Sequence, residues 1–190
     1  MQYEAIVIGV SSGGMSALKI ISSSLPVNFK LPIIIVQHVS AHSDSHWIKL
    51  LSEKSHLNVK EADEKDAIEK GNIYIAPPNY HLLIEKNKTF SLTIDERVNF
   101  ARPSIDVLFE SAAEAYTNKV IGIVLTGSNS DGTKGIKRIK ECGGLAIIQD
   151  PETAESEHMP KAAIAAIVPD YILPLEDIIK LLIQLDHPEI

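Results

Sequence analysis

A serine, a histidine and an aspartate each follow an apolar segment of this chain, and together these residue types can hydrolyse an ester or an amide. Residues 5–8 are apolar and lead into Gly9-Val10-Ser11-Ser12-Gly13. This matches the G-x-S-x-G pattern, in which a sharp turn between a strand and a helix presents a serine hydroxyl as a nucleophile. Glycine suits such a turn because it adopts dihedral angles that other residues avoid. Ser11 is therefore the candidate nucleophile.

The glycine-rich turn is also compatible with an anion site or with a purely structural role. Backbone N–H groups at a helix N-terminus attract phosphates and other anions. The dinucleotide fingerprint G-x-G-x-x-G is not matched, because Ser11 occupies the position of its second glycine, and the lysine of a P-loop is missing. The turn alone leaves all three interpretations open.

The histidine and the aspartate follow two other apolar segments. His38 comes after residues 33–36, and Asp131 lies in the loop after residues 121–125. Parallel sheets bind and react at the carboxyl ends of their strands. In a triad the serine attacks, the imidazole moves its proton and the carboxylate fixes the imidazole tautomer. The order Ser, His, Asp differs from that of the α/β-hydrolases, but a triad is recognised by geometry and not by order.

Spacing alone does not identify the partners of Ser11. A histidine after a strand could hydrogen-bond the backbone, and Asp131 could serve only as the N-cap of the helix that follows it. Asp106 and Asp150 are alternative acids for the same role.

Three histidines are spaced four residues apart, which on a helix can bind zinc. They are His38, His42 and His46. Residues 40–44 have the composition of a loop and an N-cap, and no acidic ligand or H-E-x-x-H motif follows. We therefore expect no metal site.

Two further histidines and the single cysteine are expected to have ordinary structural roles. His81 and His158 lie in predicted loops. Cys142 has no partner for an internal disulfide and is expected to pack as a small hydrophobic residue.

An alternation of strands and helices must position these side chains. Strand-like apolar segments occur at 4–10, 32–37, 72–76, 120–126 and 145–149, and helical patterns separate several of them. This predicts an α/β fold with a doubly wound, mostly parallel sheet flanked by helices. Short alternating stretches at 81–84 and 90–94 predict an antiparallel hairpin at one edge of that sheet. The apolar spacing predicts helices around Met15, Leu18 and Ile21; Trp47, Leu50 and Leu51; Ile105, Leu108, Phe109 and Ala112; Ile136 and Ile139; and Ile178, Leu181, Leu182 and Leu185.

Length and composition favour one domain over residues 1–190. The chain has 190 residues, of which 45% are hydrophobic, enough for one substantial core. The net charge of −7 argues against nucleic acid as a partner, since nucleic-acid binding requires a concentrated basic surface. The apolar segments are too short to insert into a membrane, and we find no signal-type segment. We expect a cytoplasmic protein.

Seven short motifs occur in the order seen in the catalytic domain of chemotaxis protein-glutamate methylesterases, which the chain resembles over roughly residues 3–185. Each motif is weak alone, but the ordered set is specific. The motifs are Gly9-Val10-Ser11-Ser12-Gly13-Gly14, Val36-Gln37-His38, Tyr74-Ile75-Ala76-Pro77, Arg102-Pro103-Ser104-Ile105-Asp106-Val107-Leu108-Phe109, Leu125-Thr126-Gly127, Asp131-Gly132 and Met159-Pro160.

The resemblance implies a hydrolase that removes methyl groups from glutamate γ-methyl esters on the cytoplasmic helices of chemoreceptors and releases methanol. Related enzymes also deamidate receptor glutamines. The matching positions would make Ser11 the nucleophile, His38 the general base and then acid, and Asp131 the residue that orients His38. The backbone N–H groups of Ser12 and Ser128 would stabilise the oxyanion. The resemblance implies no metal and no organic cofactor.

The resemblance leaves substrate choice and regulation less defined than the reaction. Arg102 and Met159 are candidates for substrate binding, although Arg102 could instead support the helix after it. Position 128 is often methionine in the family, and the loop after His38 lacks the usual prolines. Many members carry an N-terminal receiver domain. Here the first strand begins almost at Met1, so we expect a separate regulatory chain.

Three alternative functions stay open at this point. They are deamidation of protein glutamine, ester hydrolysis on another target, and a non-catalytic module that binds receptor helices. A pure binding module has no need for Ser11, His38 and Asp131 together.

Overall fold

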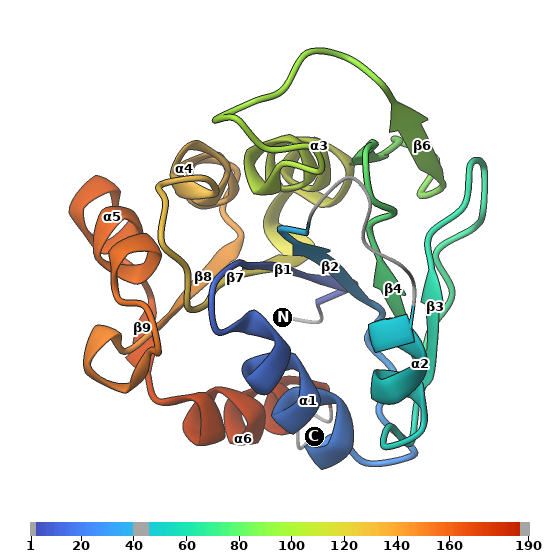
Figure 1. Ribbon diagram of the computed structural model, residues 1–190, viewed down its shortest axis with the longest axis horizontal. Coiled ribbons are helices and arrows are strands. Elements are labelled where there is room, and N and C mark those ends of the chain that lie inside the picture. Colours follow the sequence, from blue (N-terminus) through green and yellow to red (C-terminus); the bar gives the residue numbers. More distant parts are fainter. Residues whose placement is uncertain (1–2, 40–45, 187–190) are drawn as a thin grey trace.

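The computed structural model describes residues 3–39 and 46–186 and is built on a seven-stranded sheet. All the pairings within this sheet are parallel, and the strand order is β3-β4-β2-β1-β7-β8-β9 (Figure 1). The predicted parallel α/β sheet is therefore confirmed. Its strands are β1 (Ala5–Val10), β2 (Ile33–Gln37), β3 (Asn58–Glu61), β4 (Asn72–Ile75), β7 (Val120–Val124), β8 (Leu145–Gln149) and β9 (Tyr171–Leu173).

Helices cover both faces of the sheet and give two apolar cores. On one face lie α1 (Gly14–Ser24), α2 (His46–Ser52) and α6 (Leu175–Asp186), packed on side chains such as Ile6 and Ile8 of β1. On the other lie α3 (Ile105–Tyr116), α4 (Thr133–Glu141) and α5 (His158–Ala166), packed on Val7 and its neighbours (Figure 1). Because both faces are covered, the central strand β1 is buried along its whole length.

The predicted hairpin exists, but it does not extend the main sheet. β5 (His81–Ile84) and β6 (Phe90–Thr93) pair antiparallel in a separate two-stranded sheet. Leu82 and Phe90 join the core on the α3 face, where Phe90 packs edge-to-face on Tyr74 with ring centroids 4.9 Å apart. Burying these side chains requires the hairpin to lie over the sheet and not beside it.

Three elements were absent from the sequence interpretation. The strands β3 and β9 lie at the two edges of the sheet. β3 was missed because three of its four residues are polar, and β9 because it has only three residues. Helix α5 begins at His158, which was predicted to lie in a loop. His81, also predicted to lie in a loop, is instead the buried first residue of β5, where Nε2 bonds the Glu96 carbonyl at 3.0 Å and Nδ1 accepts the Ser104 N–H at 3.2 Å. Its role is therefore in packing, as expected.

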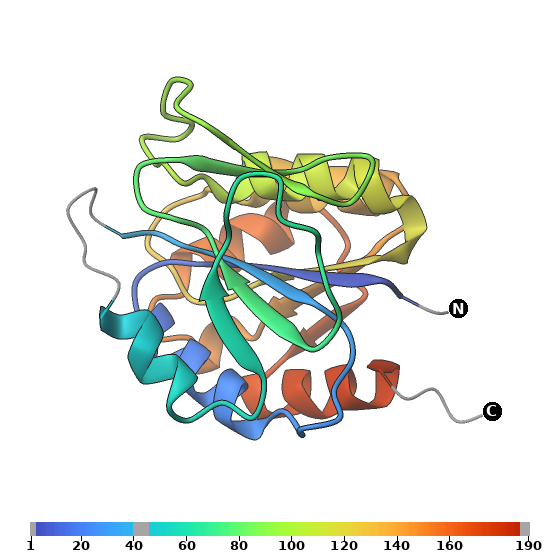
Figure 2. The ribbon, with the colours of Figure 1, turned by 90° about the vertical axis from the view of Figure 1, so that its right-hand side faces the viewer.

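Across residues 3–39 and 46–186, none of the helices has both the length and the apolar character needed to span a membrane. Figure 2 shows the loop of residues 94–101 projecting at the end of the sheet where β1 and β2 finish.

Candidate active site

The three predicted triad residues leave adjacent strands at the same end of the sheet. Ser11 follows β1, His38 follows β2 and Asp131 lies in the loop after β7. β1 pairs with β2 on one side and β7 on the other, so the parallel register places all three strand ends together. The topology of the sheet thus brings His38 and Asp131 together, although they lie more than 90 residues apart in the sequence.

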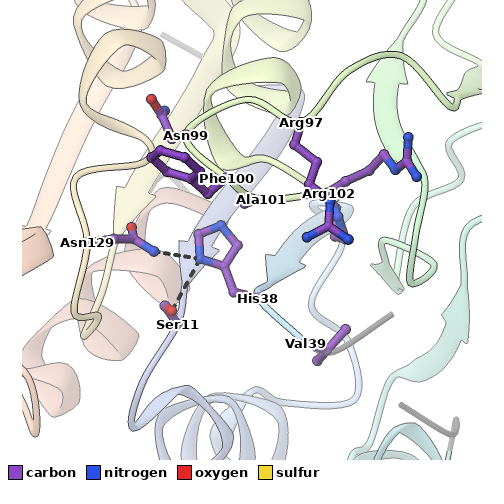
Figure 3. Close-up of a pocket in the computed structure, with 10 residues that line it drawn as sticks. Ser11, His38, Val39, Arg97, Asn99, Phe100, Ala101, Arg102 and Asn129 are labelled. Atoms are coloured by element: carbon purple, nitrogen blue, oxygen red, sulfur yellow. Dashed lines mark hydrogen bonds between the residues drawn. The ribbon is translucent and has the colours of Figure 1, made fainter. Parts of the chain in front are cut away.

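The three side chains form a continuous line of hydrogen bonds. The Nδ1 atom of His38 lies 3.2 Å from Ser11 Oγ (Figure 3). The Nε2 atom lies 2.8 Å from Asp131 Oδ2. These are the contacts that a base needs to take a proton from a serine while a carboxylate holds its other nitrogen.

Asp131 is fully buried, and donors surround its carboxylate. Oδ2 accepts the Ile105 N–H at 2.6 Å in addition to its bond with His38. Oδ1 accepts from the Asn99 amide, the Ser104 hydroxyl and the Asp106 N–H, at 3.0, 2.9 and 3.2 Å. Burial alone would raise the pKa of this carboxyl, but the bonds from His38, Asn99 and Ile105 bring the pKa below its ordinary value.

Asp131 also caps a helix, but not the helix that follows it in the chain. Residues 105 and 106 begin α3, so their N–H groups would otherwise lack a partner at its N-terminus. The positive end of the α3 dipole therefore faces the carboxylate. The sequence suggested Asp131 as the N-cap of the helix after it, whereas the structure shows it capping α3, and this capping is compatible with its contact to His38.

The alternative acids do not contact His38. Asp106 accepts the Gly135 N–H at 2.7 Å and the Asn99 amide at 2.9 Å, and burial together with the nearby Asp131 raises its pKa. The carboxylate of Asp150 accepts the Glu152 N–H at 3.0 Å at the start of the short 3-10 helix η2 (Pro151–Thr153). Of the three candidate acids, the structure brings Asp131 alone to His38.

Asn129 was not predicted, although it touches the imidazole. Its Oδ1 accepts the Asp131 N–H at 3.0 Å, which fixes the amide so that Nδ2 donates to His38 Nδ1 at 3.0 Å (Figure 3). Because a donor faces Nδ1, the ring proton belongs on Nε2, toward Asp131. The pattern Asn129-Ser130-Asp131 is an Asx-turn signature and could have signalled this contact.

The predicted oxyanion donors lie on two loops that meet beside Ser11. The hydroxyls of Ser12 and Ser128 are 2.9 Å apart. Ser11 N–H donates to the Thr126 carbonyl at 3.0 Å and Gly127 N–H donates to the Ser156 carbonyl, so these two donors are engaged. Neither the Ser12 nor the Ser128 N–H has a backbone acceptor among the described residues.

Gly127 lies where the two loops meet, and a larger residue would not fit there. A Cβ atom on Gly127 would lie 2.8 Å from the sulfur of Met159 and 3.0 Å from Ser11 Cβ. Met159 is itself completely buried on the other side of Gly127. The structure thus places Met159 behind the loop as a support and not on the wall of the cavity.

A cavity of about 590 Å³ opens above Ser11 and His38. Arg102 lines it and also donates to the carbonyls of Ile94 and Asp95, at 2.6 and 3.0 Å. Arg102 therefore both borders the cavity and ties down the loop beside it. Within the described ranges, no group of three or more His, Cys, Asp or Glu side chains is arranged to hold a metal, and His42 lies outside those ranges.

Comparisons with known proteins agree on one family. The family model described as CheB methylesterase matches residues 6–182. A protein of Leptospira interrogans, provisionally named protein-glutamate methylesterase/protein-glutamine glutaminase, is 59% identical over 187 residues, which are 98% of this chain and 97% of that protein. A Thermotoga maritima protein that carries the same two activities in its name is 38% identical over 95% of this chain, and the match spans 53% of its own length.

A solved structure gives the same result for the fold. The crystal structure of the Thermotoga maritima CheB methylesterase catalytic domain superposes with a TM-score of 0.92 at 38% identity, covering 97% of this chain and all of that one.

Proposed function

The chain belongs to the CheB methylesterase family, and we propose that it hydrolyses glutamate γ-methyl esters of proteins through Ser11, His38 and Asp131. The observation that carries this proposal is the unbroken line of hydrogen bonds from the Ser11 hydroxyl through the imidazole to a buried carboxylate. Such a line lets a serine attack an ester carbonyl at neutral pH.

In the first half of the reaction, Ser11 Oγ attacks the ester carbonyl while His38 Nδ1 takes the hydroxyl proton. The N–H groups of Ser12 and Ser128 donate to the oxyanion of the tetrahedral intermediate, and one such donor typically contributes about 3 kcal/mol. The intermediate collapses, the C–O bond to the methoxy group breaks, and Nδ1 returns the proton to release methanol.

In the second half, water hydrolyses the glutamyl ester on Ser11. His38 takes a proton from the water, whose oxygen attacks the acyl carbon, and then protonates Ser11 Oγ as it leaves. The free glutamate carboxylate departs and the serine is restored.

Asp131 supports the positive charge that His38 carries in both steps. Its lowered pKa keeps it ionised although it is buried, because α3 and three side chains supply donors. A carboxylate held in this way stabilises the imidazolium without taking its proton.

Asn129 must move away from Nδ1 during the reaction. Nδ1 has one lone pair, which Asn129 and Ser11 approach together at 3.0 and 3.2 Å. Once Nδ1 holds the serine proton, it faces another donor. Asn129 therefore secures the resting tautomer and yields when the ester occupies the site.

We propose the methylated cytoplasmic helices of chemoreceptors as the substrate, and therefore a cytoplasmic location for the protein. Hydrolysis of a glutamine side chain follows the same route with ammonia as the leaving group, and relatives are named for both activities. We propose that Arg102 contacts the substrate from the wall of the cavity. Control by a separate regulatory chain stays a prediction.

The direct test is methanol release from methylated chemoreceptor fragments by the wild type and by Ser11→Ala. The variant should lose turnover and keep its fold. Ser16→Ala, at an exposed serine of α1, is the matched control and should retain activity. Turnover by Ser11→Ala would refute the assigned nucleophile, and no release by the wild type would refute the substrate.

A further inference from the structure

The loop beside the active site holds an aromatic side chain in a conformation that aromatic residues avoid. Val98 and Ala101 exchange two backbone hydrogen bonds, of 3.2 and 2.9 Å, around a tight turn. The two central residues, Asn99 and Phe100, have φ angles of +50° and +64°. Asn and Gly favour such turns, whereas a bulky residue with positive φ is uncommon and strained.

The Phe100 side chain gains no burial in return for this strain. It is 94% exposed, although it lies beside a cavity and its turn is well ordered by hydrogen bonds. Neither local backbone preference nor core packing accounts for a phenylalanine here. Strained residues held in place by their surroundings are typical of ligand-binding segments.

The turn is anchored directly to the catalytic apparatus proposed above. Asn99 donates to Asp131 Oδ1 at 3.0 Å and to Asp106 Oδ2 at 2.9 Å. Arg102, just past the turn, donates to the carbonyl of Ile94 and to the side chain of Asn79. The backbone that carries Phe100 is therefore fixed in position relative to the proposed catalytic residues.

The opposite wall of the cavity is cationic. Figure 3 shows Phe100 on the side of Asn129, with Arg97 and Arg102 on the other side and His38 between them. Neither arginine forms an ion pair with a side chain in the part of the chain that the structure describes. Among the described residues, no Asp or Glu lines the cavity, although the whole chain carries a net charge of −7.

We propose that Phe100 and Arg97 form the docking site for the protein substrate, a helical segment that presents an acidic side chain next to the methyl ester. Phe100 packs on the apolar part of the helix, and Arg97 pairs with the acidic side chain. This inference rests on the proposed function and names how the site selects its substrate. An aromatic side chain across a cavity from an arginine without an ion-pair partner among the described residues is a typical composition for a recognition surface.

The test compares a large substrate with a small one. Methanol release from a methylated chemoreceptor fragment and hydrolysis of p-nitrophenyl acetate are measured for the wild type and for Phe100→Gly. Glycine accepts the positive φ, so the turn is kept while the ring is removed. The ratio of kcat/KM for the fragment to kcat/KM for the small ester should fall about tenfold, through KM, a change of about 1.4 kcal/mol.

Three further variants complete this experiment. Phe100→Tyr should retain the ratio, because the ring remains. Val27→Gly changes an exposed residue in the loop before β2, at the other end of the sheet, and should leave the ratio unchanged. Arg97→Ala should lower the ratio and weaken the rise of KM with added NaCl, because a charge pair is screened by salt.

The outcomes separate this inference from the proposed function. An unchanged ratio in Phe100→Gly, or an equal loss on both substrates, would overturn the docking site alone. No methanol release by the wild type would overturn the proposed function and the docking site together.

Discussion

Asp131 and Asp106 are two buried carboxylates that share the amide of Asn99, yet their surroundings shift their pKa values in opposite directions. Asp131 accepts hydrogen bonds from His38, from two side chains and from two N–H groups of the first turn of α3. Asp106 is buried with fewer donors and faces the charge of Asp131, so its pKa is raised. Burial raises the pKa of both carboxyls, and the number of hydrogen-bond donors decides which of the two stays ionised.

The comparison assigns a different task to each acid. Asp131, whose pKa is lowered, faces His38, which suits the role proposed for it in the triad. Asp106 holds Asn99 and the start of α4, through Gly135, and so fixes the turn that carries Phe100. Asp131 contacts the imidazole, whereas Asp106 holds the loop and the helix beside it.

The largest expected effect is that of Asp131→Asn. An amide NH₂ group would face donors at either oxygen position and would favour the wrong imidazole tautomer, so kcat should fall about 10⁴-fold. The unfolding free energy should fall by about 2–3 kcal/mol, because a buried donor at α3 loses its acceptor. Steady-state methanol release and urea unfolding measure the two effects. A loss below tenfold would remove Asp131 from the triad.

Asn99→Ala should have a smaller effect that reaches both acids. Removing the amide leaves each carboxylate one donor short, which typically costs about 1–3 kcal/mol of stability. We expect kcat/KM for the receptor fragment to fall about tenfold, since both the orientation of Asp131 and the position of Phe100 loosen. Asn118→Ala, at an exposed asparagine remote from the site, is the control. Wild-type kinetics in Asn99→Ala would show that the turn is held without this link.

The pH dependence of stability should separate the two acids by sign. The folded-state pKa of Asp131 is lowered from 3.8, so its ionised form stabilises the fold above that value, and this stabilisation is lost as pH falls through the folded pKa. The pKa of Asp106 is raised from 3.8, so its protonated form stabilises the fold below that value, and this is lost as pH rises through the folded pKa.

Urea unfolding of the wild type, Asp131→Asn and Asp106→Asn between about pH 3 and 7 measures this difference. The advantage of the wild type over Asp131→Asn should grow with rising pH, and its advantage over Asp106→Asn should shrink. Parallel slopes for the two variants would contradict the opposite shifts.

The smallest expected effect is on stability in Phe100→Gly. Relief of the left-handed backbone strain should raise the free energy of unfolding by about 1–2 kcal/mol. The greater freedom of glycine in the unfolded chain should lower it by roughly 0.5–1 kcal/mol. The exposed ring contributes little burial, so the unfolding free energy should rise by up to about 1 kcal/mol. A clear fall would mean that the ring packs on the turn and is not kept for recognition.

The sequence predicts the parts of the site that follow from strand order, and the structure adds those that follow from loop conformation. Ser11, His38 and Asp131 are predictable because apolar segments and glycine-rich turns mark the ends of parallel strands, and the structure brings these ends together. Strand order alone does not predict which of Asp131, Asp106 and Asp150 contacts His38, because that depends on where the N-terminus of α3 lies.

The role of Asn99 has no sequence signal, because its partners lie in α3 and beyond β7 and its φ angle is set by a turn. The hairpin was predicted but misplaced at the sheet edge, because alternation shows which side chains are buried and not what they are buried against. The role of Asn99 and the position of the hairpin were both missed because they depend on contacts between segments that are far apart in the sequence.

Whether Ser11 is a nucleophile activated by His38 and Asp131 is tested most directly by covalent labelling with a fluorophosphonate, followed by peptide mass spectrometry. A fluorophosphonate reacts with a serine activated by a neighbouring base. We expect a single adduct on the peptide that contains Ser11 in the wild type, and a labelling rate lower by at least about a hundredfold in Asp131→Asn. An adduct on another serine, or equal labelling rates in the two proteins, would contradict the assigned triad.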